Sequence, residues 1–448
     1  MVNGAAMAIL AAAPGLLAPA SARFVAGSRS SRDLLTGLAD RGALYAELDR
    51  RIAGRERFGL LLVDLDYFKD VNDTLGHDAG DAVLIELARR LTRAVGRDSL
   101  VARLGGDEFA LLIPDLSSRD DLFGSVSAVL SEASGEFEYA DQLIDCQLSI
   151  GATLARHASD RVGLMKEADI ALYRAKEDGR SRGALFSEDM RQAVHRRQAD
   201  VAAARQALAE GRIAIHYQPK VRLADRSHCG FEALLRVRSG RGALGPGAIA
   251  GAFEHRRLCA QLGRAVLDRM LADAHRWARA GRAFGHVALN VTDAELRDPS
   301  WAPMLLHRLA GTGIPPWAVQ VEITETVLLR RSSEVVKAGL DLLHARGVKI
   351  ALDDFGTGFS SLAHLRDYPV DIIKIDRSFV AALGDPDSAA LVRATIGLGK
   401  SLGLTVVAEG VENEQQHRRL RELGCDQGQG FLYGRPRRHP RFAGERRR

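Results

Sequence analysis

Residues 349–354 read KIALDD, a short apolar run that ends in two adjacent carboxylates. Similar apolar runs alternate with helical stretches along the C-terminal half: Ile213 to Tyr217, Cys229 to Leu235, His286 to Asn290, Val319 to Ile323, Ile372 to Ile375 and Thr405 to Ala408. Strand and helix repeating over about 240 residues predict a (β/α)8 barrel, although a doubly wound open sheet would give a similar pattern. The barrel is favoured because nearly every run ends in an acidic or amide residue, as a site at the C-terminal barrel face requires.

The N-terminal half has a different order of elements. Leu60 to Val63 predicts a strand, and residues 100–113 predict a hairpin whose turn is supplied by Gly105 and Gly106. Helical periodicity covers residues 78–95 and 162–178, which indicates an α+β domain. We therefore predict five segments: an apolar tail (1–31), an α+β domain (32–183), a helical linker (184–210), the barrel domain (211–440) and a basic tail (441–448).

Composition excludes several classes of protein. Of 448 residues, 46% are hydrophobic and 27% are charged, which is typical of a folded soluble protein and not of a disordered or membrane-embedded one. The four cysteines lie far apart without zinc-ligand spacing, so we expect reduced thiols in a cytoplasmic protein. The net charge of +5 is dispersed among acidic neighbours, which favours a solvated surface over a nucleic-acid partner. Pro14 and Pro19 break the N-terminal apolar stretch, and no basic residue precedes Arg23, so an irregular tail is favoured over membrane contact, and export comes last.

Four motifs in the N-terminal half occur in a distinctive order. Their sequences are DLLTGL at 33–38, DLDYFKDVNDTLGHDAGD at 64–81, GGDEF at 105–109 and ADIALYRAKEDGR at 168–180. This order and spacing resemble the GGDEF diguanylate cyclases, which form cyclic di-GMP from GTP. The resemblance implies a nucleotidyl-cyclase-like α+β fold, binding of GTP and a homodimer.

The resemblance also implies roles for individual side chains. Phosphoryl transfer needs divalent metal held by hard oxygen ligands. Asn72 and Asp81 match guanine-reading positions, and Lys176 and Arg180, one helical turn apart, would contact the phosphate tail. The full set comprises the metal ligands Asp64, Leu65 (through its carbonyl) and Asp107, the catalytic Glu108, and the GTP-binding residues Asn72, Asp81, Gly105, Gly106, Lys176 and Arg180.

Two departures from the GGDEF pattern are visible. Asp40 stands where the family usually has Asn before Arg41. The inhibitory RxxD element is absent, because Gly96 and Ser99 occupy its Arg and Asp positions. We therefore expect any cyclase activity to lack the family's usual product inhibition.

The barrel domain carries a second series of motifs. They are YQPK at 217–220, EALLR at 232–236, NVT at 290–292, EITE at 322–325, DDFGTGFSSL at 353–362, KID at 374–376, AEGVE at 408–412 and QGFLYGRP at 429–436. Their order resembles the EAL phosphodiesterases, which hydrolyse cyclic di-GMP to linear pGpG. The resemblance implies a TIM-like barrel and a site with two metals, for which carboxylate and amide oxygens select Mg²⁺ or Mn²⁺.

Roles in the barrel follow from the same resemblance. One metal would be bound by Glu232, Asn290, Glu322 and Asp353, and the second by Asp353, Asp354 and Glu409. Glu232, Lys374 and Glu409 would be catalytic, with Lys374 positioning or deprotonating the attacking water and Gln429 orienting it. Gln218 and Arg236 would contact the dinucleotide. Val237 replaces the usual Trp and Thr292 the usual Ser, but every proposed ligand is retained.

We therefore expect a cyclic di-GMP phosphodiesterase with two Mg²⁺ or Mn²⁺ ions in each active site, whose GGDEF domain binds GTP and still cyclises it. One alternative is a phosphodiesterase in which the GGDEF domain only senses GTP. Another is a non-catalytic cyclic di-GMP receptor or scaffold, which would ordinarily have lost metal ligands. Gly356 and Gly358 would give the loop after Asp354 freedom to move.

Overall fold

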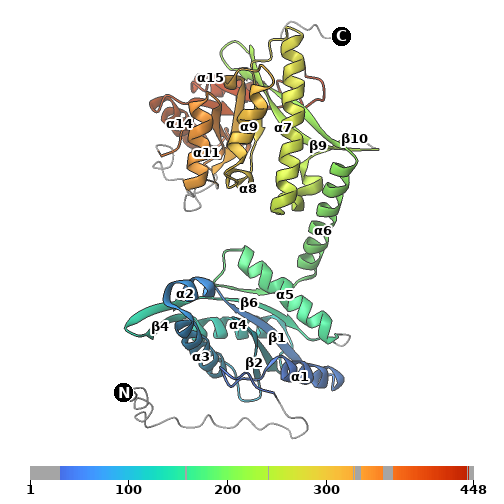
Figure 1. The fold of residues 1–448 in the computed structure, drawn as a ribbon, viewed down its shortest axis with the longest axis vertical. Helices are drawn as coiled ribbons and strands as arrows, with labels where there is room; N and C mark the ends of the chain where they lie inside the picture. Colours follow the sequence, from blue (N-terminus) through green and yellow to red (C-terminus); the bar gives the residue numbers. More distant parts are fainter. Residues whose placement is uncertain are drawn as a thin grey trace, which may run out of the picture. The chain divides into compact units, whose positions relative to one another are not determined.

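A computed structural model of the chain describes residues 31–156, 159–240, 242–325, 327, 334–356, 367–440 and 442. These residues form two compact units, divided between His195 and Arg196 (Figure 1). Except for Ser31 and Phe442, the predicted N- and C-terminal tails lie outside the described residues, as does Gly358. Among the helices that the structure describes, none combines the length and the apolar character needed to span a membrane.

The N-terminal unit is built on a five-stranded sheet in the order β2-β3-β1-β6-β7. Its strands are β1 (Phe58–Leu65), β2 (Leu100–Gly105), β3 (Glu108–Pro114), β6 (Leu148–Leu154) and β7 (Gly183–Leu185). All of β1 is buried, because this strand pairs antiparallel with β3 and β6 and helices cover both faces of the sheet. The predicted strand and hairpin are confirmed.

Alternation along β1 divides the apolar core of this unit in two. Leu61 and Val63 pack with α3 (His77–Ala94) and α4 (Arg119–Ala133), whereas Leu60 and Leu62 pack with α1 (Arg41–Ala53) and α5 (Arg161–Glu177). The unit is completed by α2 (Phe68–Leu75) and a hairpin of β4 (Gly135–Tyr139) and β5 (Gln142–Cys146). The predicted α+β fold is therefore confirmed.

Helix α6 (Glu188–Ala209) occupies most of the predicted linker. Met190 and Val194 pack against Phe186 in the N-terminal unit. Further along the helix, Ala204 and Ala207 are fully buried in the core of the C-terminal unit. The helix is therefore anchored by apolar contacts at both of its ends.

The C-terminal unit is a closed barrel. Its strands are β8 (Ile213–Arg222), β9 (His228–Ser239), β11 (His286–Asn290), β12 (Val319–Thr324), β13 (Lys349–Phe355), β14 (Ile372–Ile375), β15 (Thr405–Ala408) and β16 (Gln427–Gln429). Pairing of β8 with both β9 and β16 closes the barrel. β8 runs antiparallel to both neighbours, whereas the other strands are parallel. The predicted barrel is therefore confirmed, and β8 departs from a parallel (β/α)8 arrangement because only a short turn joins it to β9.

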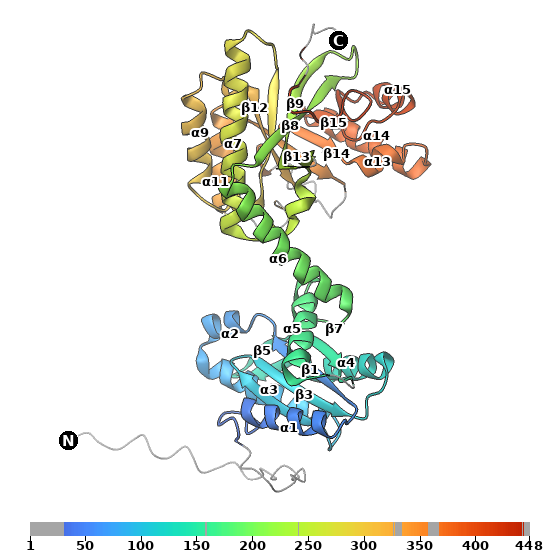
Figure 2. The same cartoon turned by 90° about the vertical axis from the view of Figure 1, so that its right-hand side faces the viewer.

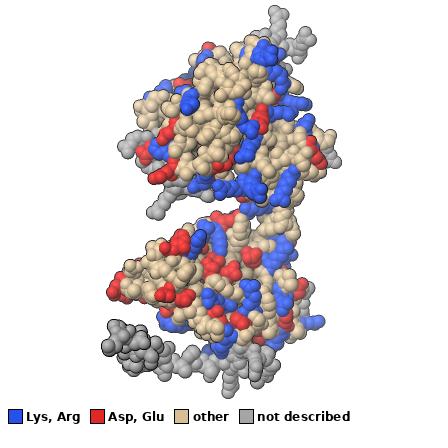
Figure 3. Space-filling view, in the orientation of Figure 1, with Lys and Arg blue, Asp and Glu red and all other residues tan. Residues whose placement is uncertain are grey.

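Helices surround the barrel (Figure 2). They are η1 (Pro246–Ala252), α7 (Arg256–Arg279), α8 (Asp293–Leu296), α9 (Trp301–Ala310), η2 (Pro316–Ala318), α11 (Glu334–Ala345), α13 (Arg377–Ala381), α14 (Pro386–Ser401) and α15 (Glu414–Glu422). The short strand β10 (Gly242–Leu244) pairs antiparallel with the end of β9. The C-terminal ends of the parallel strands meet at one mouth, where barrel enzymes place their active sites. All four cysteines are described and are free thiols. Basic and acidic side chains are interspersed over the visible face of each unit (Figure 3).

Candidate functional site

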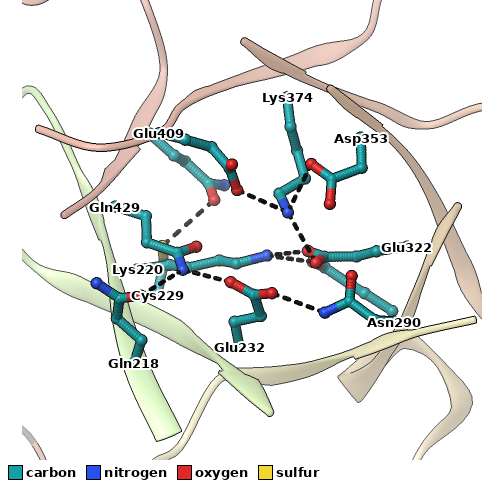
Figure 4. Close-up of polar contacts among 12 residues, drawn as sticks. Gln218, Lys220, Cys229, Glu232, Asn290, Glu322, Asp353, Lys374, Glu409 and Gln429 are labelled. Carbon is teal, nitrogen blue, oxygen red and sulfur yellow. Dashed lines mark hydrogen bonds and ion pairs between the residues drawn. The ribbon is translucent and has the colours of Figure 1, made fainter. Parts of the chain in front are cut away.

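The predicted barrel residues converge at the mouth, where several are labelled in Figure 4. They lie on neighbouring barrel strands or directly after one: Gln218 in β8, Glu232 in β9, Asn290 in β11, Glu322 in β12, Asp353 and Asp354 in β13, Lys374 in β14, Glu409 after β15 and Gln429 in β16. Strand register sets neighbours side by side, with Gln218 opposite Glu232 and Asn290 opposite Glu322. Closure of the barrel therefore assembles residues that lie far apart in the sequence.

Glu232 is held through both of its carboxylate oxygens. Asn290 Nδ2 donates to Oε1 at 2.7 Å, and Gln429 Nε2 donates to Oε2. Gln429 also donates to Gln218 Oε1 at 3.0 Å, while Gln218 donates to the Gly434 carbonyl at 3.3 Å. Gln429 Oε1 is buried and has no hydrogen-bond partner among the described residues. This acceptor can receive a hydrogen bond from a water or a ligand in the mouth.

Lys374 organises the second group of contacts. Its ammonium lies 2.8 Å from Glu322 Oε2, 3.0 Å from Asp353 Oδ1 and 2.7 Å from Glu409 Oε1. The lysine side chain is 1% exposed, and that of Glu322 is fully buried. Carboxylates from β12, β13 and the residue after β15 are therefore arranged around one buried cation, which β14 carries between them.

The charges in this group shift the pKa values of its members. Burial would lower the pKa of Lys374, but Glu322 and Glu409 outweigh this effect and raise it well above its usual value. Burial raises the pKa of Glu409. The charge of Lys374 lowers this pKa, and that of nearby Asp353 raises it. Neighbouring carboxylates therefore raise the pKa of both groups, while burial adds to the shift of Glu409 and opposes that of Lys374. Divalent cations would relieve the excess of negative charge from these carboxylates.

Asp353, Asp354 and Glu409 have the geometry of a cation site, since one oxygen from each lies within 4.8 Å of the others. A register shift in the β13–β14 pairing between Leu352 and Phe355 brings both aspartates to the mouth. Asp354 has φ +54°, a left-handed conformation that residues other than glycine rarely adopt. The donor set consists of hard oxygens and fits Mg²⁺ or Mn²⁺. In the described part of the chain, the carboxylates of Glu232, Glu322 and Asp353 do not all approach this closely.

Arg236 lies further along β9 than Glu232, and its guanidinium is half-buried. Arg236 Nη1 donates to the Leu235 carbonyl at 2.8 Å. Burial lowers the pKa of Arg236, while Glu232 raises it. Arg236, the predicted dinucleotide contact, is therefore close enough to interact electrostatically with Glu232.

The sequence prediction assigned no role to two buried residues at the barrel site. Lys220 is fully buried and lies 2.5 Å from Glu322 Oε1. Glu325, 2% exposed, accepts a hydrogen bond from the Gly356 backbone at 3.0 Å and so holds the end of β13. Their only signal in the sequence was their presence in the YQPK and EITE motifs.

In the N-terminal unit, the predicted metal ligands gather at one end of the central sheet. Asp64 lies opposite Glu108 in the β1–β3 register, and the Leu65 backbone donates to the Asp107 carbonyl at 3.3 Å. Gly105 and Gly106 have φ of +140° and +56°, values that favour glycine in this turn. Burial raises the pKa of Asp64, as does Asp107. The described acidic residues of this unit form no three-residue group with the close oxygen spacing seen in the barrel.

The predicted guanine-reading residues lie on neighbouring helices, Asn72 in α2 and Asp81 in α3. Asn72 Oδ1 approaches Gly80 so closely that a Cβ added there would lie 2.1 Å from it. Gly80 therefore provides the space that the amide occupies next to Asp81. The Asp40 departure is accommodated, since its side chain caps α1 by accepting from Ala43 N at 3.0 Å.

The predicted phosphate contacts differ from their expected arrangement. Lys176 lies in α5 and pairs with Asp64 at 2.7 Å. Arg180 was wrongly predicted to lie on the same helix, because α5 ends at Glu177 and Gly179 has φ +117°. Arg180 follows this turn, with Nε 3.8 Å from Asp66 Oδ1.

The sequence prediction also gave no role to Asp66 and Arg103. Asp66 is 5% exposed and accepts hydrogen bonds from the Ser149 hydroxyl at 2.9 Å and the Ser181 backbone at 3.0 Å. Arg103 pairs with Asp33 at 3.1 Å and donates to the Gly106 carbonyl at 2.8 Å. Each lies inside or beside a quoted motif, but sequence alone does not reveal these contacts.

Comparison with known proteins places both units in families. The family described as "EAL domain" matches residues 201–436, and the one described as "Diguanylate cyclase, GGDEF domain" matches residues 30–182. The chain is 36% identical over 411 residues to the bifunctional diguanylate cyclase/cyclic di-GMP phosphodiesterase MucR of Pseudomonas aeruginosa, covering 90% of this chain and 60% of MucR. It is 33% identical over 412 residues to the cyclic di-GMP phosphodiesterase PdeR of Escherichia coli, covering 91% of this chain and 62% of PdeR. The chain thus spans less than two thirds of the length of either relative.

Solved structures give the same result. The PaMucR phosphodiesterase in complex with c-di-GMP is 37% identical with a TM-score of 0.51, covering 53% of this chain and 97% of that chain. The S helix-GGDEF-EAL structure of Vibrio cholerae LapD bound to c-di-GMP has a TM-score of 0.54 at 19% identity. The match covers 90% of this chain and 96% of that solved chain, and it shows the fold alone. The chain therefore belongs to the family of signalling proteins in which a GGDEF domain is followed by an EAL domain.

Proposed function

We propose that the barrel hydrolyses cyclic di-GMP to linear pGpG. The observation that carries this proposal is the convergence of the family's site positions on two contact groups at one barrel mouth, around Glu232 and around Lys374. In the reaction, water adds to one phosphorus, the bond from that phosphorus to the 3′ oxygen breaks, and the 3′ oxygen takes up a proton. The activities named for MucR and PdeR support this choice of substrate.

Two divalent ions, Mg²⁺ or Mn²⁺, fit the donor set of the mouth. Asp353, Asp354 and Glu409 would hold one, and the other would be held by Glu232, Asn290, Glu322 and Asp353. When bound, such ions neutralise phosphodiester charge and make water more acidic. These ligands lie on paired strands or, for Glu409, directly after one, so strand pairing sets their spacing.

The remaining side chains suit distinct tasks. Lys374 forms ion pairs with three carboxylates at once, so it holds the ligand set together. A carboxylate that turned to bind a metal would free an N–H group of Lys374 to hydrogen-bond the attacking water. Gln429 is fixed by Glu232 and Gln218, and its unpartnered Oε1 can accept a hydrogen from that water and set its orientation. The half-buried Arg236 would contact the phosphate of the dinucleotide.

We further propose that the N-terminal unit binds GTP and forms cyclic di-GMP. The observation that favours this activity is the adjacency of Asp64, Glu108 and the glycine turn, with the Lys176 ammonium 2.7 Å from Asp64. Because the product joins two GTP molecules, two copies of the unit would each present one, so a homodimer is part of this proposal. A unit that only senses GTP would keep the guanine contacts without needing the catalytic pair.

Product analysis tests both activities. The full chain is incubated with cyclic di-GMP or GTP in Mg²⁺ or Mn²⁺, and nucleotides are separated by chromatography. We expect pGpG from cyclic di-GMP, cyclic di-GMP followed by pGpG from GTP, and no turnover after chelation. Binding of cyclic di-GMP without pGpG formation in either metal would instead support a receptor. Hydrolysis that GTP alters without being consumed would support the sensing alternative.

A further inference from the structure

Lys220 is a buried lysine beneath the proposed catalytic mouth. In the β8–β9 register it lies opposite Gly230, two residues before Glu232 and thus closer to the barrel interior. Its ammonium lies 2.5 Å from Glu322 Oε1 and 3.5 Å from Gln320 Oε1. Figure 4 shows the Lys220 side chain extending toward Glu322, whose carboxylate Lys374 also contacts. A lysine is rarely buried this completely unless its charge is paired.

The two lysines divide the oxygens of one carboxylate. Lys220 binds Glu322 Oε1, and Lys374 binds Oε2 at 2.8 Å. Lys374 also contacts Asp353 and Glu409, whereas Glu322 is the only carboxylate paired with Lys220 in the described residues. Lys220 therefore pairs with Glu322 through Oε1, and the other oxygen of Glu322, Oε2, faces Lys374 at the mouth.

We propose that Lys220 is a positioning residue for the metal site of the barrel. By holding Oε1, it keeps Glu322 oriented so that Oε2 faces the other ligands. If Lys220 were absent, Lys374 would be the one remaining charged partner of the Glu322 carboxylate among the described residues. Glu322 would then bind Lys374 with both oxygens and present neither to a metal. This inference rests on the proposed function, which makes Glu322 a metal ligand.

The substitution Lys220→Met tests the inference because it keeps an unbranched side chain and removes the ammonium. The control is Lys349→Met, which removes a lysine at the start of β13 that pairs with Asp371 at 2.7 Å. All versions of the full chain carry Asp64→Asn and Asp107→Asn, so that Mn²⁺ binding reports the barrel. Binding is measured by calorimetry, with a thermal melt to establish folding, and hydrolysis of cyclic di-GMP is measured on the same samples.

We expect Lys220→Met to weaken Mn²⁺ binding by about tenfold or more, the loss typical when a residue that orients a ligand is removed. The kcat should fall similarly, with KM for cyclic di-GMP changing much less, since Lys220 lies beneath the mouth. Lys349→Met should alter neither. Folded Lys220→Met with the Mn²⁺ affinity of Lys349→Met would overturn the inference.

A second set of variants covers the case in which Lys220→Met does not fold. As a single change, Lys220→Gln should weaken Mn²⁺ binding. When Glu322→Gln is already present, Lys220→Gln should cause no further loss of Mn²⁺ affinity. Equal losses in the two backgrounds would overturn the inference, because Lys220 would then act without Glu322. If Mn²⁺ binding depends on Lys220 but no version hydrolyses cyclic di-GMP, the positioning role stands and the proposed activity is refuted.

Discussion

The ammonium of Lys374 lies 2.7 Å from Glu409 Oε1, and backbone pairing fixes this approach. Lys374 belongs to β14, while Glu409 follows β15 and donates its backbone N–H to the Ile375 carbonyl at 3.1 Å. The Glu409 side chain is thus positioned against Lys374 by a backbone hydrogen bond to the strand that carries Lys374. The same dependence applies to Glu232, which Asn290 and Gln429 reach from other strands. Substitution of one member of the mouth should therefore disturb partners that lie far away in the sequence.

Glu232→Ala should abolish cyclic di-GMP hydrolysis. The change removes a proposed metal ligand and leaves the amide donors of Asn290 and Gln429 without their acceptor. We expect a loss of about 3 kcal/mol or more in transition-state stabilisation, which corresponds to more than about 100-fold in rate. The control Glu210→Ala removes an exposed carboxylate and should leave the rate unchanged. Near-normal pGpG production by Glu232→Ala would contradict the site assignment.

Gly80→Ala should weaken GTP binding without affecting the barrel. The added Cβ would lie 2.1 Å from Asn72 Oδ1, so the amide must leave its position. Loss of a guanine hydrogen bond should raise the Kd for GTP by up to about tenfold, measured by calorimetry. Gly124→Ala is a matched control, since its Cβ would meet no atom within 4 Å. Equal GTP affinity in the two variants would refute the role given to Asn72.

Cyclic di-GMP formation from GTP should require Asp64 and Glu108. The test uses chains in which Glu232→Ala prevents product breakdown, and compares Asp64→Asn and Glu108→Gln with Asp49→Asn. Asp49 pairs with Arg161 in the same unit, so its loss controls for a missing carboxylate. We expect the first two to lose product formation and the control to retain it. Formation that survives both changes would show that the glycine hairpin is not the cyclase site.

The cyclase should lack inhibition by its product at a remote site. Family members use an Arg and an Asp for this inhibition, and Gly96 and Ser99 stand at those positions, where the Ser99 backbone donates to the Gly96 carbonyl in a turn. In the Glu232→Ala background, cyclic di-GMP is titrated into the assay while GTP is varied. Inhibition relieved by high GTP would be competition in the active site. Inhibition that GTP cannot relieve would contradict the prediction.

Sequence patterns predicted most of the barrel because its strands are apolar runs, and the carboxylates at their ends marked the mouth. Strand β16 escaped notice because its residues, Gln427 to Gln429, include no apolar side chain. The antiparallel direction of β8 could have been inferred from the short connection between residues 222 and 228, which cannot cross over the barrel.

Other features of the sites depend on tertiary contacts. Lysine is usually exposed, so nothing in the YQPK motif revealed that Lys220 is buried against Glu322. The end of α5 was predictable in hindsight, because Gly179 is a typical helix C-terminal signal and places Arg180 beyond the helix. The contact of Asn72 with Gly80 depends on the packing of α2 against α3, which the periodicity of each helix does not specify.

The central claim is that the barrel uses water to open one phosphodiester of cyclic di-GMP. The most direct test is to run the reaction in ¹⁸O-labelled water with Mg²⁺ or Mn²⁺ and determine the mass of the product. We predict pGpG with one ¹⁸O atom in its terminal 5′ phosphate. Absence of pGpG with both metals, or pGpG without the label, would contradict the account.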